Sequence, residues 1–83
     1  MTKNDIRDRM FGIVRSVLGQ ESLALSPETT ASDVPGWDSL KHVKIILSVE
    51  DKFAIRLSAR EIDGLRNIGD FMALIAAKTG SAP

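Results

Sequence analysis

The sequence contains no cysteine, so it offers no disulfide, no zinc site built from thiolates and no cysteine nucleophile. If this protein handles a thiol, another molecule must supply that thiol. An excess of charge is missing too, because 11 basic residues balance 11 acidic ones. A neutral chain has no global field to attract nucleic acid or an anionic membrane. Any recognition through charge must therefore be local.

Long apolar runs are also absent. Polar and charged residues follow Met1, and no stretch reaches the length of a signal-peptide core or of a membrane span. We therefore expect a cytoplasmic protein without membrane partners. The composition, 43% hydrophobic and 27% charged, is typical of a soluble globular domain. We expect one monomeric domain over residues 1–83, with its core at about 3–79 and a frayed tail at 80–83.

The first third of the chain predicts a helix followed by a long loop. Apolar residues recur at spacings of three and four from Ile6 to Leu18, which predicts an amphipathic helix over about residues 3–18. Gly19 follows where a glycine can end a helix. Prolines, glycines and short polar residues then indicate a loop as far as Trp37. The apolar residues expected to anchor this loop are Leu23, Leu25, Val34 and Trp37.

A second helix is predicted from about Ser39 to Phe53, with Asp38 as its N-cap because a carboxylate there can accept from the free amides of the first turn. Large apolar residues then alternate with other residues over 53–57, as they would in a strand. This run is too short to pair with another strand, so we interpret it as an extended connector.

Two more helix starts follow the connector. Ser58 and Glu61 fit a capping box before a short helix that should carry Ile62 and Leu65. Asn67 suits the N-cap of a last helix, which should reach Lys78 on an apolar stripe. The sequence therefore predicts an all-α four-helix bundle with a long first loop and a short third helix.

The second predicted helix carries two apolar stripes rather than one. The Ile45 stripe comprises Ile45, Ile46, Val49 and Phe53, and the Leu40 stripe comprises Leu40, Val43 and Leu47. A helix in a small bundle needs one stripe for its core. The other is either buried beneath the long loop or exposed for another purpose, and the pattern leaves both open.

Two lysines stand in the first turns of this helix. Cations near a helix N-terminus oppose the helix dipole at a cost of up to about 1 kcal/mol. Lys41 and Lys44 either tolerate this cost as solvated surface residues or have an anion nearby, and a phosphate on Ser39 would be such an anion.

The segment Gly36-Trp37-Asp38-Ser39-Leu40 resembles the attachment motif of the acyl carrier protein family, Gly-x-Asp-Ser-Leu. The resemblance extends over residues 6–77, through an N-terminal helix, a long loop, the motif, a helix ending in Glu50-Asp51-Lys52-Phe53, a short helix and a last helix. It therefore implies a bundle of the acyl-carrier type.

The resemblance implies that Ser39 bears a 4'-phosphopantetheine arm, attached from coenzyme A by a phosphopantetheinyl transferase. The thiol of the arm would carry an acyl group as a thioester, which fits the lack of cysteine. The other cofactor-site residues that the resemblance implies are Gly36, Trp37, Asp38 and Leu40. The chain itself would be a carrier and not an enzyme.

The resemblance also implies a docking face for acyl-loading, acyl-transferring and acyl-modifying enzymes. Its residues are the Leu40 stripe and the charged Lys41, Lys44, Glu50 and Asp51. A short or moderate acyl chain could lie between the helices, against Ile46, Leu65 and Ile68.

The match departs from the family's housekeeping members, which are strongly acidic just after the motif. Here Lys41-His42-Val43-Lys44 stands in that place, and Trp37 lies inside the motif. Both features favour a specialised, stand-alone carrier. Fatty acyl, polyketide and aminoacyl or peptidyl cargoes all remain possible.

Four other functions have weaker support. Ser39, His42 and Asp38 could form a hydrolytic triad, but no glycine-rich oxyanion element accompanies them, and a single histidine does not make a metal site. We interpret His42 as a surface residue that tunes recognition. Two lysines provide too few phosphate contacts for a helix-turn-helix protein that binds DNA. A helical interaction module without a prosthetic group would use the same Leu40 stripe.

Overall fold

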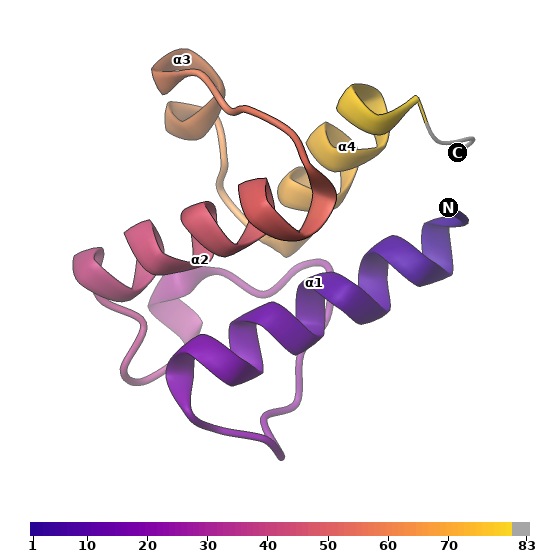
Figure 1. Cartoon of the computed structure of the whole chain (residues 1–83). Helices are drawn as coiled ribbons and strands as arrows, with labels where there is room; N and C mark the ends of the chain where they lie inside the picture. The colour runs from indigo at the N-terminus through magenta and orange to yellow at the C-terminus, as the bar shows by residue number, and fades with distance from the viewer. Residues whose placement is uncertain (81–83) are drawn as a thin grey trace.

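The computed structural model describes residues 1–80, and within that range the chain is all-α (Figure 1). The helices are α1 (Lys3–Leu18), a 3-10 turn η1 (Ala31–Asp33), α2 (Ser39–Phe53), α3 (Ala59–Asp63) and α4 (Ile68–Thr79). The predicted four-helix bundle with a long first loop and a short third helix is confirmed. Of the predicted frayed tail, residues 81–83 lie outside the described range.

Local capping sets where the four α-helices begin. Each follows a side chain that accepts a hydrogen bond from an amide of the first turn, and these side chains are Thr2, Asp38, Ser58 and Asn67. At the other end, α1 and α4 stop at Gly19 and Gly80, which take left-handed conformations with φ of 66° and 69°. Because these contacts join near neighbours, the predicted bounds are close to the observed ones.

The end of α3 differs from the prediction. Gly64 donates its backbone N–H to the carbonyls of Glu61 and Ile62, and the helix ends at Asp63. Leu65 therefore lies beyond α3 rather than on it, although it is half-buried and packs against the core. A helix this short has too few propagating hydrogen bonds to continue past a glycine.

The core lies where α1 packs against α2 and α4 (Figure 1). Its buried residues are Ile6, Met10, Ile13, Val14, Val34, Trp37, Ile45, Ile46, Val49, Phe53, Ile68, Phe71, Met72 and Ile75. No polar or charged side chain is buried among the described residues. Apolar burial is therefore the main force that holds these three helices together. Within residues 1–80, no helix combines the length and apolar character needed to cross a membrane.

The long loop is pinned to the bundle, as predicted. Val34 and Trp37 are buried, and Leu23 and Leu25 are half-buried against the core. The Nε of Arg15 in α1 donates to the carbonyl of Leu23 at 2.9 Å. These apolar and polar contacts fix the segment that leads into α2.

The loop also satisfies the free amides at the start of α4. Ile68 N–H donates to the carbonyl of Thr29 at 3.0 Å, and Gly69 N–H donates to that of Pro27 at 2.7 Å. A Cβ on residue 69 would come within 3.1 Å of the Pro27 oxygen, so a glycine permits this close approach. The loop thereby joins α1, α2 and α4 into one framework.

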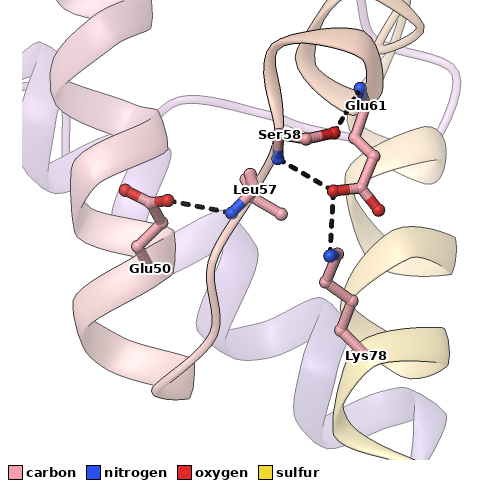
Figure 2. Close-up of polar contacts among 5 residues, drawn as sticks. All are labelled: Glu50, Leu57, Ser58, Glu61 and Lys78. Carbon is pink, nitrogen blue, oxygen red and sulfur yellow. Dashed lines mark hydrogen bonds and ion pairs between the residues drawn. The ribbon is translucent and has the colours of Figure 1, made fainter.

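Polar contacts hold α3 and the connector before it (Figure 2). Glu50 of α2 accepts a hydrogen bond from Leu57 N–H at 2.9 Å, and Glu61 of α3 pairs with Lys78 of α4 at 2.8 Å. No residue of α3 is fully buried. The connector forms no strand, as predicted.

Candidate functional site

A tight turn leads the chain into α2. Trp37 N–H donates to the carbonyl of Val34 at 3.2 Å, which closes a four-residue turn with Pro35 and Gly36 at its centre. Gly36 has a φ of 90°, a value that the third residue of a type II turn needs and that glycine reaches without strain. The side-chain amide of Gln20 donates to Pro35 O at 3.1 Å. The backbone conformation of this turn therefore explains why the motif has a glycine at this position.

Asp38 then caps α2 and leaves Ser39 as its first residue. The Oδ1 of Asp38 accepts from Lys41 N–H at 2.9 Å, and its backbone carbonyl accepts from His42 N–H at 2.9 Å. Ser39 is exposed, and its hydroxyl makes no hydrogen bond within the described part of the chain. The helix start presents amides and a positive partial charge beside this hydroxyl, which suits an attached phosphate.

The two lysines near Ser39 have no acidic partner. Lys41 is half-buried and Lys44 is exposed, and neither forms an ion pair within residues 1–80. Their charges add to the positive end of the helix dipole rather than offsetting it. A phosphodiester on Ser39 would remove part of that unfavourable interaction, so these residues fit a 4'-phosphopantetheine group.

The structure decides between the two uses of the second apolar stripe on α2. Leu40, Val43 and Leu47 are 62%, 51% and 58% exposed, whereas the Ile45 stripe is buried in the core. The long loop therefore does not cover the Leu40 stripe. Large apolar side chains gathered on one exposed helix face mark a surface suited to binding another protein.

The two acidic residues expected on the docking face have different environments. Glu50 is half-buried, and its Oε2 accepts from Leu57 N–H, so this carboxylate supports the connector (Figure 2). Asp51 is exposed and has no ion-pair partner among the described residues. Asp51 is therefore the freer of the two to face a partner.

Trp37 and His42 lie deeper than the motif suggests. Trp37 is 8% exposed, so its side chain belongs to the core, and its Nε1–H donates to Nδ1 of His42 at 3.1 Å. His42 is half-buried with its ring against Phe71, so it is less exposed than the surface residue that we expected. Burial lowers the pKa of His42 below its ordinary value of 6.5. The sequence gives no local signal for this pair beyond the presence of the two residues.

The arrangement does not form a hydrolytic triad. The Nδ1 of His42 accepts from Trp37, and the Asp38 carboxylate accepts from the backbone of Lys41. No hydrogen bond joins Ser39 to His42 within residues 1–80. The three side chains thus lack the chain of contacts that would activate a serine.

The expected acyl-chain lining is not open in this structure. Ile46 and Ile68 are buried in the core, and Leu65 lines a cavity of about 40 Å³ together with Trp37 and His42. A space of that size holds about one water molecule. It is too small for an acyl chain.

The chain is similar to carrier proteins along most of its length. Residues 8–75 match the family described as "Phosphopantetheine attachment site". The chain is 30% identical to the acyl carrier protein of Acidothermus cellulolyticus, over 99% of this chain and 98% of that one. It is 32% identical to the meromycolate extension acyl carrier protein of Mycobacterium tuberculosis, over 90% of this chain and 65% of that longer relative.

A solved structure has the same fold. The solution structure of the holo acyl carrier protein from Geobacter metallireducens aligns with a TM-score of 0.82 at 36% sequence identity. The alignment covers 88% of this chain and 84% of that one.

Proposed function

Because the chain belongs to the acyl carrier protein family, whose prosthetic group is 4'-phosphopantetheine, we propose that Ser39 is the residue that bears this group. The observation that carries the proposal is the exposed Ser39 hydroxyl at the start of α2, between Asp38, which caps the helix, and two unpaired lysines. Ser39 is also the serine of the Gly-x-Asp-Ser-Leu motif.

The attachment is a group transfer from coenzyme A. The Ser39 oxygen forms a bond to the phosphorus that carries pantetheine, and the pyrophosphate bond of coenzyme A breaks. Adenosine 3',5'-bisphosphate leaves, and the hydroxyl proton passes to the transferase or to water. The chain contributes the exposed nucleophile and the positive helix start, while the transferase supplies activation. Once attached, the group supplies the thiol that this cysteine-free chain lacks.

The docking face for partner enzymes is the Leu40 stripe with its charged rim. The stripe is apolar and exposed, and Lys41, Lys44 and Asp51 lie on the same helix. Glu50 contributes less to the rim, because its carboxylate is engaged with Leu57 N–H. The apolar centre supplies binding energy, and the rim charges mainly steer association.

The rim also restricts which partners fit. Lys41 and Lys44 stand next to the attachment residue, so a partner that docks here needs carboxylates opposite them. Housekeeping carriers present the opposite charge at this place. We therefore assign the chain to a specialised acyl-transfer pathway, with a fatty acyl, polyketide or aminoacyl cargo.

Modification with coenzyme A tests the assignment of Ser39. The wild-type chain, incubated with coenzyme A and a broad-specificity phosphopantetheinyl transferase, should gain the mass of one phosphopantetheine group. Ser39→Ala should gain none, because the hydroxyl is removed. Ser32→Ala, a matched change at an exposed serine of the loop, should gain the group as the wild type does.

Two results would overturn the assignment. If Ser39→Ala is still modified, another residue is the attachment site. If the wild-type chain stays unmodified while a known carrier in the same reaction is converted, the proposed carrier chemistry at this site is wrong.

A further inference from the structure

Two aromatic side chains meet across the proposed attachment residue. Trp37 precedes Ser39 and lies at the end of the loop, and His42 follows it in the first turn of α2. The Trp37 Nε1–H donates to His42 Nδ1 at 3.1 Å, and the ring centroids are 6.1 Å apart. This contact joins the chain before Ser39 to the chain after it.

The aromatic contact adds to the two hydrogen bonds that Asp38 makes in the same segment. Asp38 accepts from Lys41 N–H through its carboxylate and from His42 N–H through its carbonyl. Together, the three hydrogen bonds close residues 37–42 into a compact unit. The Ser39 hydroxyl takes part in none of them, so it stays available while the backbone around it is held.

The pair also connects this segment to the core. Trp37 is buried, and the ring of His42 lies edge-on to Phe71 of α4 at a centroid distance of 5.9 Å. A cavity of about 40 Å³ beside the two rings leaves little free space around them. Movement of either ring therefore requires repacking against α4.

We propose that the Trp37–His42 hydrogen bond is a positioning device for Ser39, which holds the helix start in the conformation that the phosphopantetheinyl transferase recognises. Trp37 and His42 are positioning residues, since neither is placed in contact with the reacting atoms. The proposal rests on Ser39 being the attachment residue. It assigns to the tryptophan of the motif and to the only histidine of the chain a role that the attachment chemistry alone does not require.

The hydrogen bond requires a particular protonation state of His42. Nδ1 can accept from Trp37 only when it carries no proton, so the proton of the neutral ring is on Nε2. Burial favours this neutral form by lowering the pKa of His42. Arg66, between α3 and α4, is the charged residue that lines the neighbouring cavity, and no carboxylate lines it. The bond is therefore intact at neutral pH and is lost as the pH falls through the folded pKa of His42.

The first test compares rates of modification. Trp37→Phe removes the donor and keeps an aromatic ring, and His42→Leu removes the acceptor. Each should lower kcat/KM for modification by about three- to tenfold, because the helix start then samples other conformations. His42→Asn should stay within about twofold of wild type, because its side-chain oxygen stands where Nδ1 stood and cannot titrate. All rates are measured at a temperature where circular dichroism shows the variants folded.

The second test needs no transferase. In the unmodified protein, the Lys41 amide and the amide of residue 42 both donate to Asp38, and their hydrogen exchange should speed up in Trp37→Phe and His42→Leu but not in His42→Asn.

A third comparison returns to the transferase. The modification rate of wild type relative to that of His42→Asn should fall as the pH drops through the folded pKa of His42, which lies below 6.5, because only the wild type loses its acceptor. Dividing the wild-type modification rate by that of His42→Asn cancels the pH dependence of the transferase itself.

The outcomes separate the two proposals. If folded Trp37→Phe and His42→Leu are modified at the wild-type rate, or if His42→Asn is as slow as His42→Leu, the positioning role is wrong. If wild type and all variants remain unmodified, the attachment proposal fails. In that case unchanged exchange of the Lys41 and His42 amides in Trp37→Phe would also remove the positioning role.

Discussion

The helices α2 and α3 are held in this small bundle by different forces. α2 is 15 residues long and buries four apolar side chains, the Ile45 stripe, against the core. α3 has five residues, none of them fully buried, and only Ile62 among them packs against the core as a partly buried apolar side chain. It also depends on a capping box, the Glu61–Lys78 ion pair and the tether from Glu50 to Leu57 (Figures 1 and 2). Full burial of four apolar side chains thus fixes the helix that begins at Ser39, whereas α3 combines the partial burial of Ile62 with charges and hydrogen bonds.

This difference shows how a small domain can hold a helix in place through one apolar face while the other apolar face stays exposed. The Ile45 stripe stabilises α2, so the Leu40 stripe need not contribute to folding. α3 has no comparable reserve of buried area, so its position should respond to salt, pH and ligands more readily than that of α2.

The largest expected effect comes from placing the same charge on the two faces of α2. Ile45→Asp puts a carboxylate at a fully buried position and should lower the free energy of unfolding by at least about 4 kcal/mol, enough to unfold a domain of this size. Leu47→Asp changes an exposed position and should cost less than about 0.5 kcal/mol. Urea unfolding followed by circular dichroism measures both.

The same pair of variants tests the docking face. Leu47→Asp should keep its helical spectrum, and its loaded form should transfer its acyl group to partner enzymes less efficiently. Loss of the fold in Leu47→Asp would place the Leu40 stripe in the core and remove the contrast between the two faces.

A smaller effect is expected at the connector to α3. Glu50→Ala leaves Leu57 N–H without its acceptor and should cost about 1 kcal/mol of unfolding free energy, together with faster hydrogen exchange at the Leu57 amide. Asp51→Ala, at the neighbouring exposed residue, is the matched control and should change stability by less than about 0.5 kcal/mol. Equal effects of the two changes would show that the tether from Glu50 does not support α3.

The smallest effect should come from acid at the Glu61–Lys78 pair. The bond with Lys78, followed by that with the Ser58 amide, lowers the pKa of Glu61 below its ordinary value of 4.5. A lowered carboxyl pKa stabilises the fold above 4.5, and this contribution is lost as the pH falls through the folded pKa. The protection factors of the α3 amides, which correct for the intrinsic slowing of exchange in acid, should therefore fall by about two- to threefold on acidification, while those of α2 change less.

A lysine substitution provides the control for the acid effect. Lys78→Met should lower the protection factors of α3 at neutral pH and flatten their pH dependence, because the carboxylate then lacks its main partner. Lys52→Met changes an exposed lysine that has no ion pair within residues 1–80 and should leave the pH dependence intact. A pH dependence in Lys78→Met equal to that of wild type would assign the effect to another carboxyl group, such as Asp5, whose pKa is also lowered.

The helices were predictable because their signals are local. Asp38 and Asn67 were identified as caps from their positions before apolar runs, and both accept the expected backbone hydrogen bonds. Such contacts join residues three apart, so the sequence order itself brings them together. Leu65 was misplaced because the backbone contacts of Gly64 ended α3 earlier than the apolar spacing suggested.

The site was predictable only in part. Ser39 and the Leu40 stripe were identified from the motif and the helical period, but the pattern did not tell which stripe would be buried. Nor did it predict that Glu50 would support Leu57 or that His42 would accept from Trp37. Those contacts depend on where the loop, the connector and α4 come to lie against α2.

The order of residues by itself determined the four helices, their caps and the serine at the start of α2, because hydrogen bonds and apolar repeats within a few residues are fixed by covalent spacing. Only the packing of α1 and α4 on the Ile45 stripe decided that the Leu40 stripe faces solvent. Burial is shared among segments far apart in the chain, and a helical pattern does not specify which of its faces those segments will cover.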